Sequence, residues 1–292
     1  MAESPEAIIA ALPCWRGPVS LTPLHGGLSN ASFRAEDLTG SYIARFGRDF
    51  PFHYVSRAHE AAASRWAAEA GIAPRLHYAG QGCLVAAFIE GVTLDADALA
   101  ARRADALALV TRVHRDLPRR ARGDAPFFWP FAVLRGYEEN LLRAKHAISP
   151  DLPRLLAIVD GCEAAQVPMP IVFGHHDLLP ANFLDDGKRL WLVDWEYAGF
   201  GTPMFDLANL AVNAALDEAG GHALLTRYFG RPADHATWRA FRAMRLASAL
   251  REWLWACVSE VHLNAPGADY GAYALKCRAA FETAMARDGD AP

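Results

Sequence analysis

The sequence predicts an α+β protein with a small strand-rich lobe followed by a larger, mainly helical lobe. Short strand-like segments separated by glycines fill the first 90 residues, and helical periodicity dominates from about residue 92 onward. The 292 residues suffice for one to two domains, and a composition of 52% hydrophobic and 21% charged residues argues against disorder. We expect an N-terminal lobe at 1–90, a C-terminal lobe at 91–292 and a hinge near Glu90 and Gly91.

The N-terminal lobe is expected to contain five strands and one helix. Segments 19–24, 31–36 and 41–47 are the first three strand candidates, and "HGGLSN" (25–30) predicts a tight turn between the first two. Ser56 precedes the alanine-rich "RAHEAAASRWAAEAG", which predicts a helix capped at its C-terminal end by Gly71. "GIAPRLHYAG" and "CLVAAFIEG" predict two further strands.

The remainder of the chain is expected to be mostly helical. Helical periodicity is found in 94–117, 132–148, 151–166, 205–216, 236–261 and 270–286. Two apolar segments, one before residue 175 and one at 189–195, interrupt this region as short strands.

Charge and composition exclude several classes of function. A net charge of -4 and a pI near 6.3 give no general nucleic-acid footprint, and the basic run "RVHRDLPRRARG" is interpreted as a solvated helix end and loop. No stretch approaches the ~18 apolar residues of a membrane span, and the N-terminus lacks the pattern of a secretory signal. Five scattered cysteines without a C-x-x-C pair favour reduced thiols. We therefore expect a cytoplasmic protein without nucleic-acid or membrane partners; its oligomeric state stays open.

A polar motif stands out in the second half of the chain. In "FGHHDLLPANFL" (173–184), His175 lies two residues before Asp177, and Asn182 lies five after it. Asp194 ends the hydrophobic run "LWLVD". Phosphoryl transfer needs a carboxylate that orients the attacking hydroxyl and accepts its proton, together with hard oxygen ligands for Mg²⁺. The spacing predicts Asp177 as the catalytic base and Asn182 and Asp194 as the metal ligands.

The same spacing occurs in the protein-kinase catalytic loop H-R-D-L-x-x-x-N. Phe-Gly is absent after Asp194, and "DWEYAGFGTPMFDLANL" instead resembles the aminoglycoside phosphotransferase and choline kinase superfamily. The resemblance covers roughly residues 20–285 and lies closest to bacterial choline/ethanolamine kinase-like proteins. It implies a bilobal protein-kinase-like fold with a small antiparallel sheet in the N-terminal lobe. It also implies that His175 and Asp206 buttress the catalytic loop, whereas we interpret His176 as a variable filler position.

The resemblance further implies that the N-terminal lobe binds ATP. "LHGGLSN" is similar to the phosphate-covering turn of the choline kinase branch, and glycines there let the backbone approach phosphates. The expected contacts of this turn are Gly26, Gly27, Ser29 and Asn30.

Three further features are expected to complete the ATP site. Arg45 in "YIARF" stands where the family directs a basic residue at the phosphates, and a guanidinium suits that task. Glu60 matches the helical glutamate that pairs with this residue. The hinge strand "LVAAFIEG" should present its backbone to adenine near Ala87, Phe88 and Ile89.

The acceptor is expected to bind against the last two helices. "ALREWLWACVSEV" (249–261) resembles the tryptophan-bearing helix of choline/ethanolamine kinases, and "ADYGAYALKCRAAFE" resembles a second family stretch. Trp253 and Trp255 point in nearly opposite directions, so Trp253 is assigned to the core. Residues three positions apart share a helix face, as Glu252 and Trp255 do, and as Tyr270 and Tyr273 do. A carboxylate that lies beside aromatic rings can bind an ammonium group. The expected acceptor contacts are Glu196, Tyr197, Glu252, Trp255 and Tyr273.

Several functions remain open at this point. The leading expectation is an ATP- and Mg²⁺-dependent phosphotransferase acting on the hydroxyl of a small cationic alcohol, with choline or ethanolamine first. An aminoglycoside or thiamine kinase of the same fold is the alternative within enzymes. A non-catalytic, nucleotide-binding pseudokinase is the alternative from another class, and a metal hydrolase would require transition-metal binding by His175 and His176.

Overall fold

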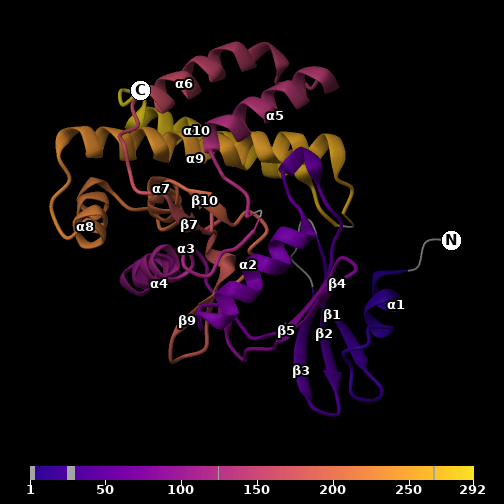
Figure 1. Cartoon of the computed structure of the whole chain (residues 1–292). Helices are drawn as coiled ribbons and strands as arrows, with labels where there is room; N and C mark the ends of the chain where they lie inside the picture. Colours follow the sequence, from indigo (N-terminus) through magenta and orange to yellow (C-terminus); the bar gives the residue numbers. More distant parts are fainter. Residues whose placement is uncertain (1–3, 25–29, 124, 266) are drawn as a thin grey trace.

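The computed structural model describes residues 4–24, 30–123, 125–265 and 267–292. Its N-terminal lobe is built on a five-stranded antiparallel sheet with the strand order β1-β2-β3-β5-β4 (Figure 1). The strands are β1 (Ser20–Leu24), β2 (Ala31–Asp37), β3 (Gly40–Phe46), β4 (Leu76–Gly80) and β5 (Cys83–Ala87). The helix α1 (Pro5–Ala10) precedes them.

Alternating side chains of the central strands form a small core with α1. Phe33 on β2 is paired with Ala44 on β3, which is in turn paired with Val85 on β5. These three residues are buried together with Ile9 of α1. Because side chains of a strand alternate between its faces, this register places the apolar positions of all three strands on the side that α1 covers.

The helix α2 (Arg57–Glu69) connects the two lobes. The Asp49 carboxylate accepts the backbone N–H of Arg57 at 2.7 Å and so caps the first turn. The last helical residue is Glu69, and Ala70 is its C-cap. The chain then turns away at Gly71, whose φ of +66° is the left-handed conformation that glycine adopts readily. Ala63 and Ala67 of α2 belong to the large core of the C-terminal lobe and not to the small core of the sheet.

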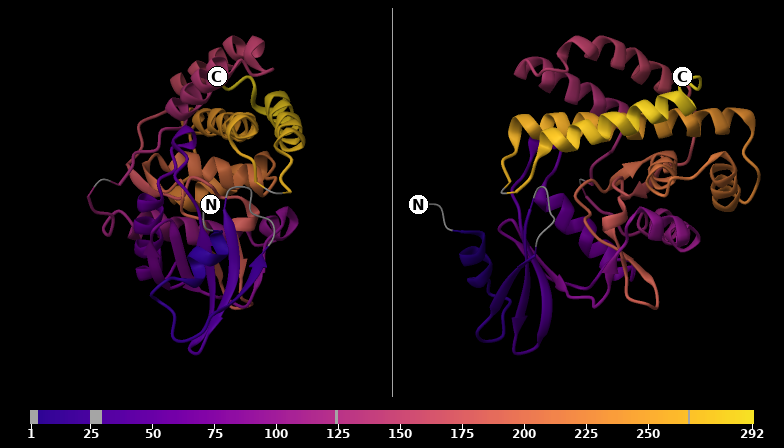
Figure 2. Two further views of the ribbon diagram at one scale, coloured as in Figure 1. Left: turned by 90° about the vertical axis from the view of Figure 1, so that its right-hand side faces the viewer. Right: turned by 180° about the vertical axis from the view of Figure 1, so that it is seen from behind.

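The C-terminal lobe is organised around one long helix, α9. Nearly all residues of α9 between Ala240 and Ser259 are buried, because the helix lies between other helices. The helix α10 runs beside it, and α5 and α6 pack on it from one side while α7 packs from another (Figures 1 and 2). The helices of this lobe are α3 (Ala96–Ala101), α4 (Arg103–Asp116), α5 (Pro130–Ala144), α6 (Leu152–Ala164), α7 (Pro203–Asn213), α8 (Glu218–Phe229), α9 (His235–His262) and α10 (Tyr270–Asp288).

Two small sheets position the polar segments of the lobe. One contains β6 (Val92–Thr93), β8 (Phe183–Asp185) and β9 (Leu190–Leu192), and the other contains β7 (Val172–Gly174) and β10 (Gly199–Gly201). Short 3₁₀ turns occur at Pro51–His53, Ser149–Asp151 and Pro180–Asn182. Segment 175–182 joins β7 to β8, and segment 193–198 joins β9 to β10. Since the two sheets are linked by both segments, the two polar motifs of the sequence lie side by side.

The predicted fold class is confirmed, and most predicted elements agree with the structure. The sequence did not predict α1, α8 or the short strands β6, β8 and β10, and the helix predicted at 94–117 is divided into α3 and α4. The division at residues 90 and 91 stays a prediction. In the part of the chain that the structure describes, we find no helix with the length and apolar character of a membrane span.

Candidate functional site

The loop between β7 and β8 carries Asp177 and Asn182, and the structure brings them together. The Asn182 amide donates to the Asp177 backbone carbonyl at 2.8 Å and to its Oδ2 at 3.1 Å. These bonds use the amide nitrogen, so the amide oxygen of Asn182 is directed elsewhere. Both side chains are buried.

Asp206, in the first turn of α7, holds this loop from behind. Its Oδ2 accepts the backbone N–H of His175 and its Oδ1 that of His176, both at 2.8 Å. The ring of His114 on α4 adds a third contact, 2.9 Å between Nε2 and Oδ2. Burial alone would raise the pKa of Asp206, but the bond from His114 and the donors around it hold the pKa well below its usual value. Asp206 is therefore an ionised anchor for the catalytic loop, as predicted for its position.

His176 is not filler, which corrects our interpretation of the sequence. It is fully buried, has a φ of +63° and stacks on Phe128 with ring centroids 4.3 Å apart. Its Nδ1 lies 3.1 Å from the backbone carbonyl of Tyr197. Gly174 permits this position, because a Cβ there would overlap the His176 ring. A left-handed, non-glycine residue costs free energy, and here the ring contacts hold it in place.

The His175 ring links the loop to the metal-ligand candidate Asp194. Its Nε2 lies 2.9 Å from the Val193 backbone carbonyl, directly before Asp194. Both histidine rings thus contact backbone oxygens. Over the described ranges, no three His, Cys, Asp or Glu side chains are grouped as metal ligands. The contacts of these rings are structural, which gives the metal-hydrolase alternative no support.

Two arginines and three carboxylates join the lobes. Arg45 on β3 forms an ion pair with Glu60 on α2, and its Nη1 lies 2.8 Å from Asp194 Oδ1. Arg57 Nη1 lies 2.5 Å from Glu60 Oε2 and 2.9 Å from Glu196 Oε2. The expected pair of Arg45 and Glu60 is present. It belongs to a larger network that also contains Asp194 and Glu196 of the "DWEYAG" segment.

The network decides the charge of Asp194 and Glu196. Burial alone would raise the pKa of Asp194, but the Arg45 guanidinium holds the pKa below its usual value. Burial, followed by the Asp194 charge, raises the pKa of Glu196. Asp194 is thus the more acidic of the two carboxyls, and its backbone has a strained φ of +66°. One carboxylate and the Asn182 amide oxygen are the hard donors that Mg²⁺ takes in kinases, where phosphates and water complete the shell. The residues present fit the metal.

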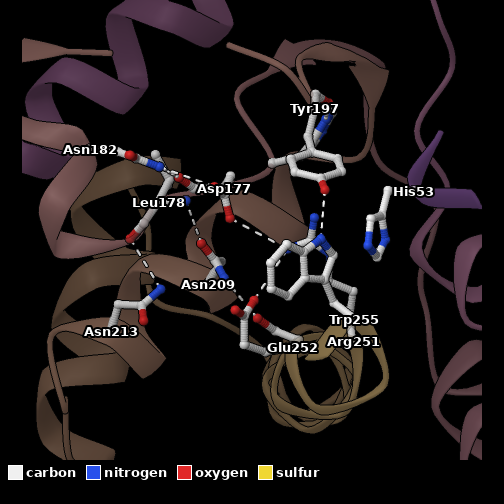
Figure 3. A network of polar contacts seen from close by, with 12 residues as sticks. His53, Asp177, Leu178, Asn182, Tyr197, Asn209, Asn213, Arg251, Glu252 and Trp255 are labelled. Atoms are coloured by element: carbon white, nitrogen blue, oxygen red, sulfur yellow. Dashed lines mark hydrogen bonds and ion pairs between the residues drawn. The ribbon is translucent and has the colours of Figure 1, made fainter. Parts of the chain in front are cut away.

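A cluster of charged and aromatic side chains lies beyond Asp177 (Figure 3). Arg251 Nη1 on α9 lies 3.4 Å from Asp177 Oδ1 and 3.3 Å from Glu252 Oε2. The same guanidinium lies 4.3 Å over the ring centroid of Tyr197. Burial raises the pKa of Asp177, the Arg251 charge opposes the rise, and Glu252 adds to it. The carboxylate is accordingly a better proton acceptor than an exposed aspartate.

Four of the five predicted acceptor residues also meet in this cluster, whereas Glu196 contacts Arg57 in the network between the lobes. The Trp255 indole donates to the Tyr197 hydroxyl at 2.7 Å, and the Tyr273 hydroxyl donates to Glu252 Oε1 at 2.5 Å. Trp253 lies on the other side of α9, its ring centroid 5.4 Å from that of Phe281. The prediction that the two tryptophans face different ways, with Trp253 in the core, is confirmed.

The predicted nucleotide contacts are only partly described. Gly26, Gly27 and Ser29 lie outside the described residues, and Asn30 directly precedes β2. Ala87 ends β5, and the Phe88 N–H donates to the Ser41 carbonyl at 3.1 Å. Ile89 follows in the connection to β6. The roles of these residues in adenine and phosphate binding stay predictions.

Sequence reasoning missed Arg57, Arg251, His53 and His114. Arg57 carried a signal, because it lies three residues before Glu60 on a helix and such residues are neighbours. Arg251 stands between apolar residues and next to Glu252 in α9, and a buried arginine needs a charged partner. His53 and His114 touch residues far along the chain, and no local pattern indicates such contacts.

Comparison with models of protein families shows to which family the chain belongs. The model of the phosphotransferase enzyme family matches residues 20–245. The chain belongs to this family. This membership confirms the predicted superfamily and the enzyme class that the polar motif indicated.

Solved structures of similar proteins agree with the assignment. A choline/ethanolamine kinase family protein from Mesorhizobium loti is 31% identical, with a TM-score of 0.73 over 98% of this chain and 96% of that one. The choline kinase LicA from Streptococcus pneumoniae has a TM-score of 0.71 at 21% identity, over 93% of each chain. The second comparison shows the fold alone.

Curated relatives match over shorter stretches. Protein LicA of Haemophilus influenzae is 32% identical over 108 residues, which are 35% of this chain and 39% of that protein. Ethanolamine kinase 2 of Mus musculus is 25% identical over 204 residues, 63% of this chain and 50% of that protein. The matched regions thus span half or less of these two relatives.

Proposed function

We propose that the chain is an ATP- and Mg²⁺-dependent phosphotransferase that acts on the hydroxyl of a small cationic alcohol, with choline and ethanolamine as the first acceptors to test. One observation carries the proposal. Asp177 lies between the metal-ligand candidate Asn182, at 3.1 Å, and the charged and aromatic cluster that begins with Arg251, at 3.4 Å. A carboxylate in that position can serve both a bound phosphate donor and a bound alcohol.

The residues have distinct parts in the proposed reaction. Asp177 orients the acceptor hydroxyl and takes up its proton as the acceptor oxygen forms a bond to the γ-phosphorus. The bond from that phosphorus to the bridging oxygen breaks, and ADP leaves. Asn182 and Asp194 would hold Mg²⁺, which supplies charge compensation on the phosphates when bound. Arg45, kept in place by Glu60, provides the positive charge that faces the phosphates.

The cluster supports a cationic acceptor. The charges of Glu252 and Glu196 both act on Asp177, Tyr273 donates to Glu252, and the bonded pair of Trp255 and Tyr197 lies in the same cluster as Glu252. Carboxylates and aromatic rings both stabilise an ammonium group. Two of the relatives, a choline/ethanolamine kinase family protein and ethanolamine kinase 2, are named for the same class of acceptor.

The alternatives have less support. A spectinomycin phosphotransferase shares the fold at 11% identity and a TM-score of 0.59, which carries no argument about the acceptor. No contact of the described residues favours thiamine. A pseudokinase would have no need of the bonds that join Asp177 to Asn182, or of an ionised Asp194 on Arg45.

Acceptor-stimulated ADP release tests the proposal. The purified chain with ATP and Mg²⁺ is assayed against choline, ethanolamine, thiamine, homoserine and an aminoglycoside. We expect turnover with an amino alcohol and a loss of about 10²- to 10⁴-fold in Asp177→Asn, since that range is typical for removal of a general base. The exposed Asp160→Asn on α6 is the matched control. Absence of stimulation by every alcohol would support the pseudokinase.

A further inference from the structure

The segment between β3 and α2, residues 48–56, crosses from the ATP lobe to the acceptor lobe; we term it the strap. Its 3₁₀ turn (Pro51–His53) packs on α5 and α9. Phe52 stacks on His262 of α9, with ring centroids 4.3 Å apart. Tyr54, at a φ of +61°, lies against Gly136 of α5, where a Cβ would overlap the tyrosine hydroxyl. The strap is therefore fitted to the C-terminal lobe and is more than a connection.

His53 carries the strap into the acceptor cluster. Its side chain is almost fully buried, with Nε2 2.9 Å from Ser259 Oγ and Nδ1 3.3 Å from the Tyr137 hydroxyl. The imidazole lies nearly parallel to the Trp255 indole, at 21°, with ring centroids 5.0 Å apart (Figure 3). Burial, together with the nearby Arg251 and His262, lowers the pKa of His53 to about 3. The His53 imidazole that stacks on Trp255 is thus uncharged at neutral pH.

The aromatic faces of the cluster are occupied by the protein itself. His53 covers one face of Trp255, and the Arg251 guanidinium covers a face of Tyr197. Trp255 and Tyr197 are only 6% and 8% exposed. The Glu252 carboxylate remains more open, with 21% of its side chain exposed. Beside the buried rings of Trp255 and Tyr197, the more open group that the cluster offers an incoming cation is the Glu252 carboxylate.

The two kinds of ammonium alcohol require different partners. A quaternary ammonium has no N–H group and is recognised by open aromatic faces, whereas a primary ammonium has three donors that a carboxylate can accept. We propose that His53 makes the acceptor site selective for a primary over a quaternary ammonium alcohol by covering the Trp255 face. This inference rests on the proposed function and narrows its acceptor class.

The test compares two alcohols in wild type and in two variants of His53. The measured quantity is the ratio of kcat/KM for choline to kcat/KM for ethanolamine, from Mg²⁺-ATP-dependent ADP release. We expect wild type to favour ethanolamine by about tenfold, and His53→Ala to raise the ratio by about tenfold, as one newly available cation–π contact would. His53→Phe keeps a ring on Trp255 and should retain the wild-type ratio.

His262, the histidine of α9 on which Phe52 of the strap stacks, gives the control. His262→Ala removes the ring beneath Phe52 but leaves Trp255 covered, so the ratio should stay within about twofold of wild type. If His53→Ala does not fold, Ser259→Ala, which removes the bond that holds the imidazole, is expected to move the ratio in the same direction.

Three results would overturn the inference while leaving the proposed function intact. They are a wild-type preference for choline, an unchanged ratio in folded His53→Ala, and an equal change in His262→Ala. If neither alcohol stimulates ADP release in wild type, the proposed function fails first and the inference with it.

Discussion

Arg57 of α2 and Glu196 of the segment after β9 form an ion pair of 2.9 Å between Nη1 and Oε2 that joins the two lobes. Both side chains are nearly buried, at 10% and 7% exposure. Loss of one partner leaves a buried charge without compensation, which typically costs about 3–5 kcal/mol. The pair is accordingly expected to contribute to both stability and the alignment of the lobes.

A double-mutant cycle measures this pair. Arg57→Met should lower the free energy of unfolding by about 3 kcal/mol, and Glu196→Gln by less, because Arg57 then keeps its contact with Glu60. The double variant should lose less than the sum, because the second change removes a group that the first left without its partner. Chemical denaturation of the four proteins gives the coupling, expected at about 1–3 kcal/mol. The exposed pair Arg143 and Glu139 serves as the control and should couple by less than about 1 kcal/mol. Additive effects for Arg57 and Glu196 would contradict the assigned contact.

Asp206→Asn tests the anchor of the catalytic loop. Asparagine has one acceptor oxygen, whereas the two oxygens of Asp206 accept from His175, His176 and His114. We expect a loss of about 2–3 kcal/mol in the free energy of unfolding, the usual cost of losing hydrogen bonds to a buried charge.

The same substitution should lower kcat, because Asp177 is no longer held. Asp217→Asn at the N-terminus of α8 is a suitable control, since asparagine caps helices as well as aspartate does. Equal stability losses in the two variants would argue against a special role for Asp206.

His53 predicts a pH dependence of stability. Its pKa is about 3 in the folded chain, against about 6.5 for an unperturbed histidine, so the unfolded chain binds more protons between these values. The contribution of a neutral His53 is fully present above pH 6.5 and is lost as the pH falls. The loss amounts to about 2 kcal/mol at pH 5. Denaturation at pH 7 and pH 5 should show a larger loss in wild type than in His53→Phe. Equal losses would mean that His53 is protonated in the folded state.

Glu252→Gln tests the charge of the acceptor site. Removal of the carboxylate should raise KM for a cationic alcohol by about tenfold, equivalent to one weakly screened ion pair, and leave KM for ATP unchanged. Initial rates over a matrix of ATP and acceptor concentrations separate the two constants. Glu260→Gln, eight residues further along α9 and paired with His146, is the control. A rise in KM for ATP alone would move Glu252 away from the acceptor.

The catalytic loop could be predicted because its chemistry is local in sequence. The spacing from His175 to Asn182 places each residue in one loop, and Asp194 follows a strand that packs beside it. Asp206 was also predictable, since it lies in the first turn of α7 after a recognisable family segment. Repeated short-range patterns also gave the strands and most of the helices.

The acceptor cluster could be predicted only in part because it is assembled from distant segments. The contact between His53 and Ser259 spans 206 positions, and Arg251 meets Asp177 across 74. The sequence indicated which face of α9 carries Glu252 and Trp255, but not which segment covers that face. The burial of Arg251 in an apolar helix depends on carboxylates that no local pattern connects with it.

The packing of α2 has a consequence for regulation. Protein kinases control their rate by moving the helix that carries the paired glutamate. Here Ala63 and Ala67 of that helix lie in the core of the opposite lobe, and Trp66 packs edge-on against Phe173. A swing of α2 would expose this apolar surface to water, at about 25 cal/mol for each Å². We expect a catalyst without a resting, switched-off state, whose output in the cell follows the supply of its two substrates.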